Sequence, residues 1–407
     1  MANRWLLWVL ATLMLGFINL EFYAVGAVAA KVDESFGIGP SRTGLLFGIF
    51  TLFYGALQIP VGLAYARFNP VRLLLVACIV FAVGNLLFAF SPGFGLAILG
   101  RVISGIGGSC FFLGFVAIAS RNFEPQLYAR LLGFNQTFKF SVLLVALVLM
   151  PTILLHFGWR IYFAMISGVF LCLSVPLAVI ATRRVERHET TGESGAWQGL
   201  LDLVRNPQII RYLVIGLFSS GGIIAFSGLW YLPYAERLGY PPKDADLLVS
   251  AMMLAMGIGM ALSGWISDWL KLRKPILVIG LVVTLLSTSV VCFSAKIPPW
   301  LEIGTIFICA GASSAFYAMA YVMVKELVPA RLITTANGIL NTAIFMGAAL
   351  LQYLPGLILR LEHGGAGKID DATVTGFQLA LLIFPVGYLI SLIASLGLKE
   401  TGGAQCE

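Results

Sequence analysis

Long apolar runs alternate with short polar segments along the whole chain. The runs from Leu73 to Leu99 and from Ile276 to Ser294 contain no Lys, Arg, Asp or Glu. About 20 apolar residues in a helix are enough to cross a hydrocarbon core of about 30 Å. The pattern therefore predicts twelve membrane-spanning helices, at residues 5–30, 43–64, 71–90, 95–119, 131–154, 161–181, 209–233, 247–267, 275–295, 300–323, 335–359 and 375–397.

The composition excludes a water-soluble globule. Hydrophobic residues make up 59% of the 407 residues and charged residues only 11%, with a mean hydropathy of +0.94. A soluble domain carries about 25% charged residues because its surface faces water. Lipid must replace the missing polar surface, so we expect an all-α integral membrane protein. The first apolar run, Trp5 to Ala30, is too long for the core of a cleavable signal and is expected to stay as a helix.

The positions of the basic residues predict the orientation. If the N-terminus is cytoplasmic, 16 of the 26 Lys and Arg residues fall in cytoplasmic loops and ends and 8 in outer loops, while Arg101 and Lys139 lie within spans. This excess indicates that both termini are cytoplasmic. Because the termini are short and no large extra domain is evident, we expect a bacterial inner-membrane protein. Because the net charge of +7 is spread over short loops, nucleic-acid binding is not expected. No two of the six cysteines have metal-ligand spacing, so no metal, cofactor or disulfide framework is expected.

Two halves of six spans repeat one another. Leu45-Leu46 and Gly62 match Leu247-Leu248 and Gly264 at an offset of 202 residues. A polar segment separates the halves, which gives an N-terminal half at 1–182, a cytoplasmic linker at 183–208 and a C-terminal half at 209–407. A parallel repeat related by a pseudo-two-fold axis along the membrane normal is a known transporter plan.

The loop after the eighth span carries the most specific motif of the chain. It places Gly264, then Asp268 four residues later, then the basic residues Arg273 and Lys274. The loop after the second span, from Gly62 to Arg72, is a weaker copy in which Ala66 replaces the acid. With these loops the chain resembles the major facilitator superfamily over essentially its whole length. The resemblance and the helix-end position of the acid assign an inner gate to Gly62, Arg67, Gly264, Asp268, Arg273 and Lys274. A loop that only sets the membrane topology is the alternative.

Two further motifs support this resemblance. One is Arg101-x-x-x-Gly105-x-Gly107 in the fourth span, and the other is Gly158-Trp159-Arg160 before the sixth. The resemblance implies two six-helix bundles that rock around a central site, with a functional role for Arg101 in proton coupling. The fifth span lacks the Gly-Pro-rich motif typical of proton-driven drug antiporters, which weakens the drug-exporter interpretation.

Ionisable side chains deep in a span point to function because burying an uncompensated charge there is costly. Glu21, Arg101 and Lys139 are the three candidates. Helix rise places Glu21 roughly 24 Å from the inner start of its span and Arg101 roughly 9 Å from the outer start of its own. We therefore expect a Glu21–Arg101 pair that couples transport to protons. The alternatives are a purely structural pair, or an Arg101 side chain that extends to the membrane surface.

Lys139 shares one helical face with Asn135 and Gln136, which predicts a contact with a substrate carboxylate or phosphate. Extension of Lys139 to the cytoplasmic surface is the alternative. One acid and two bases give this set a net charge of +1, which favours an anionic solute. The second half is expected to have no deep charge. Its candidates are four aromatic residues, for which interfacial anchoring or packing is the alternative, and three amides: Trp230, Tyr231, Tyr317, Tyr321, Asn337, Asn341 and Gln352. Asn337 and Asn341 are four residues apart, which predicts a shared face of the eleventh span. Gly221-Gly222 is expected either to break the seventh span or to allow close helix packing.

Together these features predict a monomeric secondary transporter for a small organic anion, coupled to protons and embedded in the lipid bilayer. Two alternatives remain: a proton-driven exporter of a lipophilic compound or siderophore, and a receptor or scaffold that keeps the fold without transport. An enzyme is not expected, because no nucleophile–base set and no phosphate-binding loop is present, and the three histidines, His156, His188 and His363, fall in loops or at span ends.

Overall fold

The computed structural model describes residues 2–123, 125–181, 203–293, 298–328, 333–362 and 372–401. These residues form helices joined by short turns, with no strand among them. Their contacts divide the chain into two compact units. Unit 1 comprises residues 1–36 and 49–191, and unit 2 comprises residues 37–48 and 192–407. Most of the predicted linker, up to residue 202, lies outside the described residues.

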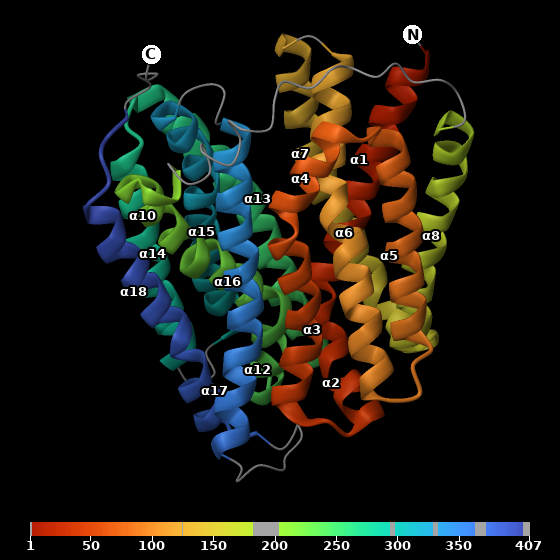
Figure 1. The fold of residues 1–407 in the computed structure, drawn as a ribbon. Helices are drawn as coiled ribbons and strands as arrows, with labels where there is room; N and C mark the ends of the chain where they lie inside the picture. The colour runs from red at the N-terminus through yellow and green to blue at the C-terminus, as the bar shows by residue number, and fades with distance from the viewer. Residues whose placement is uncertain are drawn as a thin grey trace. The chain divides into compact units, whose positions relative to one another are not determined.

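Unit 1 is built from long helices packed side by side (Figure 1). Its first span bends at Ala24, so the predicted helix at 5–30 consists of two helices instead of one. The helices are α1 Ala2–Tyr23, α2 Val25–Phe36, the second half of α3 Gly39–Ala56, α4 Gln58–Arg67, α5 Pro70–Ala89, α6 Phe94–Asn122, α7 Pro125–His156 and α8 Gly158–Ala181.

Unit 2 contains the first half of α3 and the helices that follow residue 202. They are α10 Pro207–Ile215, the π-helix η1 Gly216–Ser220, α11 Gly221–Ala225, the π-helix η2 Phe226–Trp230, α12 Tyr231–Arg237, α13 Pro242–Leu270, α14 Lys274–Phe293, α15 Pro299–Leu327, α16 Ile333–Glu362, α17 Val374–Leu381 and α18 Ile383–Leu396.

The helices match the predicted spans in number. Ten of them are long and apolar enough to cross a membrane, and the bent pair of α3 with α4 adds one more. Helix α7 has 32 residues, a length of about 48 Å, and covers the predicted fifth span at 131–154. The all-helical twelve-span fold predicted from the apolar runs is confirmed.

Glycines bring α5 and α6 into close contact in unit 1. A methyl group at Gly84 would overlap the backbone nitrogen of Ser104 and lie 2.8 Å from the carbonyl oxygen of Gly100. Gly107 faces α5 in the same way, with the nitrogen of Phe81 2.5 Å from the place where a Cβ would be. Small residues of this kind let helix backbones approach in a bilayer, where apolar burial between helices contributes little.

The seventh span remains helical through Gly221-Gly222. Gly221 has φ −62° and ψ −39°, and a Cβ there would lie 2.7 Å from the nitrogen of Ala348. Close packing against α16 therefore explains the glycine, and the predicted break is not found. The irregularity appears on both sides instead, as the π-helices η1 and η2. Such wide turns are rare in helices and occur frequently at functional sites.

The contact between α5 and α6 predicts opposite effects for two glycine substitutions. Gly84→Ala should destabilise the protein by about 1–3 kcal/mol, because the added methyl group collides with backbone. Gly168→Ala on α8 should leave stability unchanged or raise it by up to about 1 kcal/mol, because nothing lies within 4 Å of its added methyl group. Thermal unfolding of both variants in detergent tests this, and equal melting temperatures would contradict it.

Candidate functional site

A buried ion pair joins the first and fourth spans of unit 1. Arg101 Nη1 donates to Glu21 Oε2 at 2.6 Å, and both side chains are 0% exposed. Asn85 of α5 donates through Nδ2 to the other carboxylate oxygen of Glu21, also at 2.6 Å. The pair expected from helix depths is therefore present, and three helices meet at one carboxylate.

Aromatic rings surround the guanidinium group of Arg101. Its Cζ lies 4.4 Å from the ring centroid of Phe50, 5.2 Å from that of Phe88 and 5.6 Å from that of Phe163. Cations over aromatic faces are stabilised, most strongly where water is absent. Arg101 is thus held inside unit 1, which rules out the alternative that it extends to the membrane surface.

Lys139 lies apart from this ion pair, on α7. Its neighbour Phe138 packs against Gly16 of α1, where an added Cβ would lie 2.7 Å from the phenyl ring. Gly16 is five residues from Glu21, so Lys139 lies roughly 8 Å from Glu21 along the helix axis. Lys139 is half-buried, and the structure contains no hydrogen bond or ion pair between it and another described side chain.

The structure describes the side chain of only one of the two predicted neighbours of Lys139. Asn135 is 3% exposed, and its Nδ2 has no hydrogen-bond acceptor among the described residues. The side chain of Gln136 lies outside the described residues. A buried amide donor one helical turn from a half-buried lysine is a set suited to an oxygen-rich ligand.

Four of the predicted residues of unit 2 gather between α15 and α16. The Tyr321 hydroxyl donates to Asn341 Oδ1 at 2.8 Å, and the rings of Tyr317 and Tyr321 lie 5.3 Å apart. Asn337 lies one helical turn before Asn341, with a buried Oδ1 that accepts no hydrogen bond from the described residues. The spacing of these asparagines had predicted a shared face, and the structure adds the two tyrosines to it.

The other predicted aromatic residues of unit 2 lie elsewhere. Trp230 Nε1 donates to the carbonyl oxygen of Gln352 at 3.1 Å, which is a packing contact between η2 and α16. Tyr231 donates its hydroxyl to Glu302 Oε1 at 3.0 Å. Both aromatic side chains are 0% exposed.

Glu302 corrects one expectation from the sequence. The second half was expected to have no deep charge, yet Glu302 is 1% exposed and packed in the interior of unit 2. It was missed because it is the fourth residue of α15, where an acid usually faces solvent at a helix N-terminus. Its position within the predicted span at 300–323 was the one available signal.

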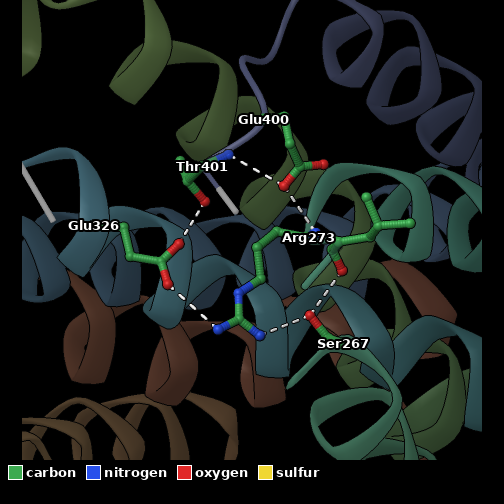
Figure 2. Close-up of polar contacts among 6 residues, drawn as sticks. Ser267, Arg273, Glu326, Glu400 and Thr401 are labelled. Atoms are coloured by element: carbon green, nitrogen blue, oxygen red, sulfur yellow. Dashed lines mark hydrogen bonds and ion pairs between the residues drawn. The ribbon is translucent and has the colours of Figure 1, made fainter. Parts of the chain in front are cut away.

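A polar network occupies the end of unit 2 at which the described chain finishes (Figure 2). Arg273 Nη1 donates to Ser267 Oγ at 2.8 Å, and Arg273 Nη2 lies 3.4 Å from Glu326 Oε1. Thr401 donates its hydroxyl to the other oxygen of Glu326. Glu400 accepts the backbone N–H groups of Arg273 and Lys274 at 2.8 and 3.0 Å. A carboxylate from the C-terminal segment therefore caps the first turn of α14.

The structure gives the surroundings of three of the remaining gate candidates, Lys274, Gly62 and Gly264. Lys274 Nζ donates to the carbonyl oxygen of Leu396 at 2.8 Å, at the end of α18. A Cβ at Gly62 would meet only Leu113, at 3.8 Å, and one at Gly264 would meet nothing within 4 Å. The side chains of Arg67 and Asp268 lie outside the described residues. Arg273 and Lys274 are thus tied to their own unit by bonds that the sequence pattern did not reveal.

Comparison with known proteins places this architecture in a family. The family model described as the Major Facilitator Superfamily matches residues 9–350 and, in a second match, 231–403. The chain is 23% identical over 389 residues to the "Probable L-galactonate transporter" of Escherichia coli, covering 89% of this chain and 82% of that protein. It is 24% identical over 390 residues to the "Multidrug resistance protein MdtL" of Klebsiella pneumoniae, covering 94% and 96%.

A solved structure shows the same fold. The crystal structure of a D-xylose-proton symporter superposes with a TM-score of 0.76 at 16% identity, covering 98% of each chain. At this identity the likeness concerns the fold alone. With the family model matching most of the chain, the conclusion is plain: the protein belongs to the Major Facilitator Superfamily and is a multi-pass membrane protein of the secondary-transporter class, not an enzyme.

Proposed function

We propose that the protein moves a small organic anion across a bacterial inner membrane together with protons, by alternating access. It would act as a monomer with both termini in the cytoplasm. The observation that carries this proposal is the sealed Glu21–Arg101 pair, with both side chains 0% exposed. Because this pair is neutral as a whole, the excess positive charge of the three ionisable residues in the spans of unit 1 falls on Lys139.

Lys139 is the group that would attract the anion. A lysine held in a membrane span without a counter-ion is costly, and a bound carboxylate would offset that cost. Asn135, with its buried amide donor, could bind a second oxygen of the same ligand. Relatives of this chain include a transporter named for L-galactonate, a hydroxylated carboxylate.

The ion pair would couple the anion to a proton through Arg101. While Glu21 is ionised, it neutralises Arg101 and three helices stay joined. A proton on Glu21 would remove that negative charge and leave the guanidinium group in need of another anion. The substrate can supply it, so the proton and the anion favour each other's binding. This reciprocity couples the binding of the proton to the binding of the anion, which the proposed symport would use.

In unit 2, the cluster of Tyr317, Tyr321, Asn337 and Asn341 is suited to a hydroxylated solute. It offers phenol and amide groups that both donate and accept hydrogen bonds. At the end of the same unit, Arg273 and Lys274 would act in gating, with Asp268, Arg67, Gly62 and Gly264 as the other proposed gate residues. The bonds from Arg273 to Ser267 and Glu326 would then hold the gate in one of its states.

A second candidate function is proton-driven export of a lipophilic compound or siderophore. The rings around Arg101 would suit such a compound if the pair opened toward it. The similarity to a multidrug resistance protein also favours this candidate. The substrate would then be an aromatic or lipophilic molecule, and Lys139 would not be needed to bind it.

The proposed role of Lys139 predicts the behaviour of one alanine variant. A carboxylate ligand at about 100 times its dissociation constant should stabilise the wild-type protein by about 2.7 kcal/mol. Lys139→Ala should lose this stabilisation because it removes the charge that binds the carboxylate. Thermal-shift measurements with galactonate and other carboxylates test this, with Lys243→Ala as an exposed-lysine control that keeps the effect. Undiminished stabilisation of Lys139→Ala by carboxylates would refute the role, and stabilisation by lipophilic compounds alone would favour the exporter.

The Glu21–Arg101 pair predicts strong coupling between two substitutions. Glu21→Gln and Arg101→Gln should each destabilise the protein by about 3–5 kcal/mol, because each leaves one buried charge uncompensated. The double variant should be more stable than either single variant, since both charges are gone. Denaturation of the four proteins in detergent measures this double-mutant cycle. Additive losses would mean that the two residues do not act as a pair.

A further inference from the structure

Glu302 is a buried carboxyl group that the proposed mechanism leaves unused. It lies in the first turns of α15, is 1% exposed and is 24 residues from Glu326 on the same helix. At 1.5 Å per residue the two carboxyl groups are about 36 Å apart. Glu302 therefore lies at the end of unit 2 remote from the Arg273 network. Tyr231 of α12 donates to its Oε1 at 3.0 Å.

The groups that face Glu302 include no cation among the described residues. Tyr231 and Tyr234 come from α12, Cys292 from α14 and Cys309 from α15 itself. Tyr240, which follows α12, lies near the two tyrosines. Every one of these groups is neutral when protonated and negative when ionised, so none can compensate a carboxylate charge.

Glu21 has a cationic partner, whereas Glu302 has none among the described residues, and a cationic partner favours the ionised form of a buried carboxyl group. Glu21 is paired with a guanidinium group at 2.6 Å and accepts a second bond from Asn85. From the described side chains, Glu302 accepts one bond, which comes from the phenol of Tyr231. A buried carboxylate without a cation is expensive, whereas the neutral acid needs only ordinary hydrogen bonds. In the neutral form Oε1 accepts from Tyr231 and Oε2 carries the proton.

The two carboxyl groups hold equivalent helices together in the two halves. Glu21 joins the first span of unit 1 to Arg101 of the fourth. Glu302, on the tenth span, joins the fourth span of the C-terminal half to Tyr231 on its first. Separation of either helix pair would expose its carboxyl group to water, where the ionised form is favoured.

We propose that Glu302, with Tyr231 as its hydrogen-bond donor, is a second proton-binding site of this protein. Glu302 Oε2 takes one proton from a hydronium ion in the adjoining aqueous phase, which leaves water, and returns it to water when α12 and α15 separate. No other bond is made or broken. The claim that this proton is carried during transport rests on the proposed function. The claim that Glu302 binds a proton does not rest on it.

Infrared spectroscopy of the purified protein tests the site without any substrate. A protonated carboxyl group gives a carbonyl band that carboxylates lack. Glu302→Gln should lose one such band at neutral pH, and Tyr231→Phe should keep the band but move it to higher frequency, because a hydrogen bond to the carbonyl oxygen is removed. A spectrum of Glu302→Gln that matches the wild type in this region would overturn the proposal.

Glu362 provides a matched control. It is an exposed glutamate that also accepts from one hydroxyl group, Thr373 Oγ1 at 3.0 Å. Glu362→Gln should leave the carboxylic-acid bands unchanged at neutral pH, because the side chain that it replaces is exposed to water rather than buried. If Glu362→Gln and Glu302→Gln both lost the same band, that band could not belong to the buried carboxyl group of Glu302.

Transport in proteoliposomes tests whether the proton is carried. The number of protons moved per solute should fall by one in Glu302→Gln relative to the wild type and stay unchanged in Glu362→Gln. An unchanged ratio in Glu302→Gln would refute proton carriage by this residue. Glu21→Gln separates the two proposals: if it retains full proton coupling while Glu302→Gln loses the infrared band, the proposed function fails and the second proton site stands.

Discussion

The ion pair between Glu21 and Arg101 is the contact that holds helices α1, α5 and α6 together at one buried carboxylate. Two charges inside a membrane protein are tolerated only when they compensate each other, and here the compensation comes from helices α1 and α6. Asn85 adds α5 to the same carboxylate, and phenyl rings exclude water around the guanidinium group. Any event that changes the charge of one partner therefore changes the free energy of holding these helices together. Under the proposed function, this structural contact would respond to a proton and to the bound anion.

The surrounding fold explains how that contact is held. Gly84 and Gly107 let α5 and α6 approach closely, which brings Asn85 to the side of α6 that carries Arg101. In unit 2 the comparable contact between the first and fourth spans of the C-terminal half uses Tyr231 and Glu302, with no cation beside them among the described residues. The two halves thus repeat their helix plan but differ in the electrostatics of the equivalent junction. Under the two proposals above, one half would respond to an anion and the other to a proton alone.

Much of this could be predicted from the sequence, for definite physical reasons. The spans follow from uninterrupted apolar runs, and the Glu21–Arg101 pair follows from helix depth, because an isolated charge at either position is too costly. Glu302 was missed because an acid near a helix N-terminus usually reaches solvent, and only the tertiary packing of α12 reveals its burial. The contacts of Arg273 with Glu326 and Glu400 join segments 53 and 127 residues apart in the chain, and no local pattern specifies them.

Whether the Glu21–Arg101 pair couples a proton to the solute is tested with the double variant Glu21→Gln/Arg101→Gln in proteoliposomes. Two kinds of transport are compared. Exchange of labelled solute at equal concentrations on both sides needs only binding and conformational change, whereas accumulation driven by a proton gradient needs coupling. If the buried pair couples one proton to the solute, the double variant will retain exchange, and its accumulation will fall below the wild-type level to what the Glu302 proton alone supports. If accumulation persists at the wild-type level, the pair is structural and the proton is coupled elsewhere.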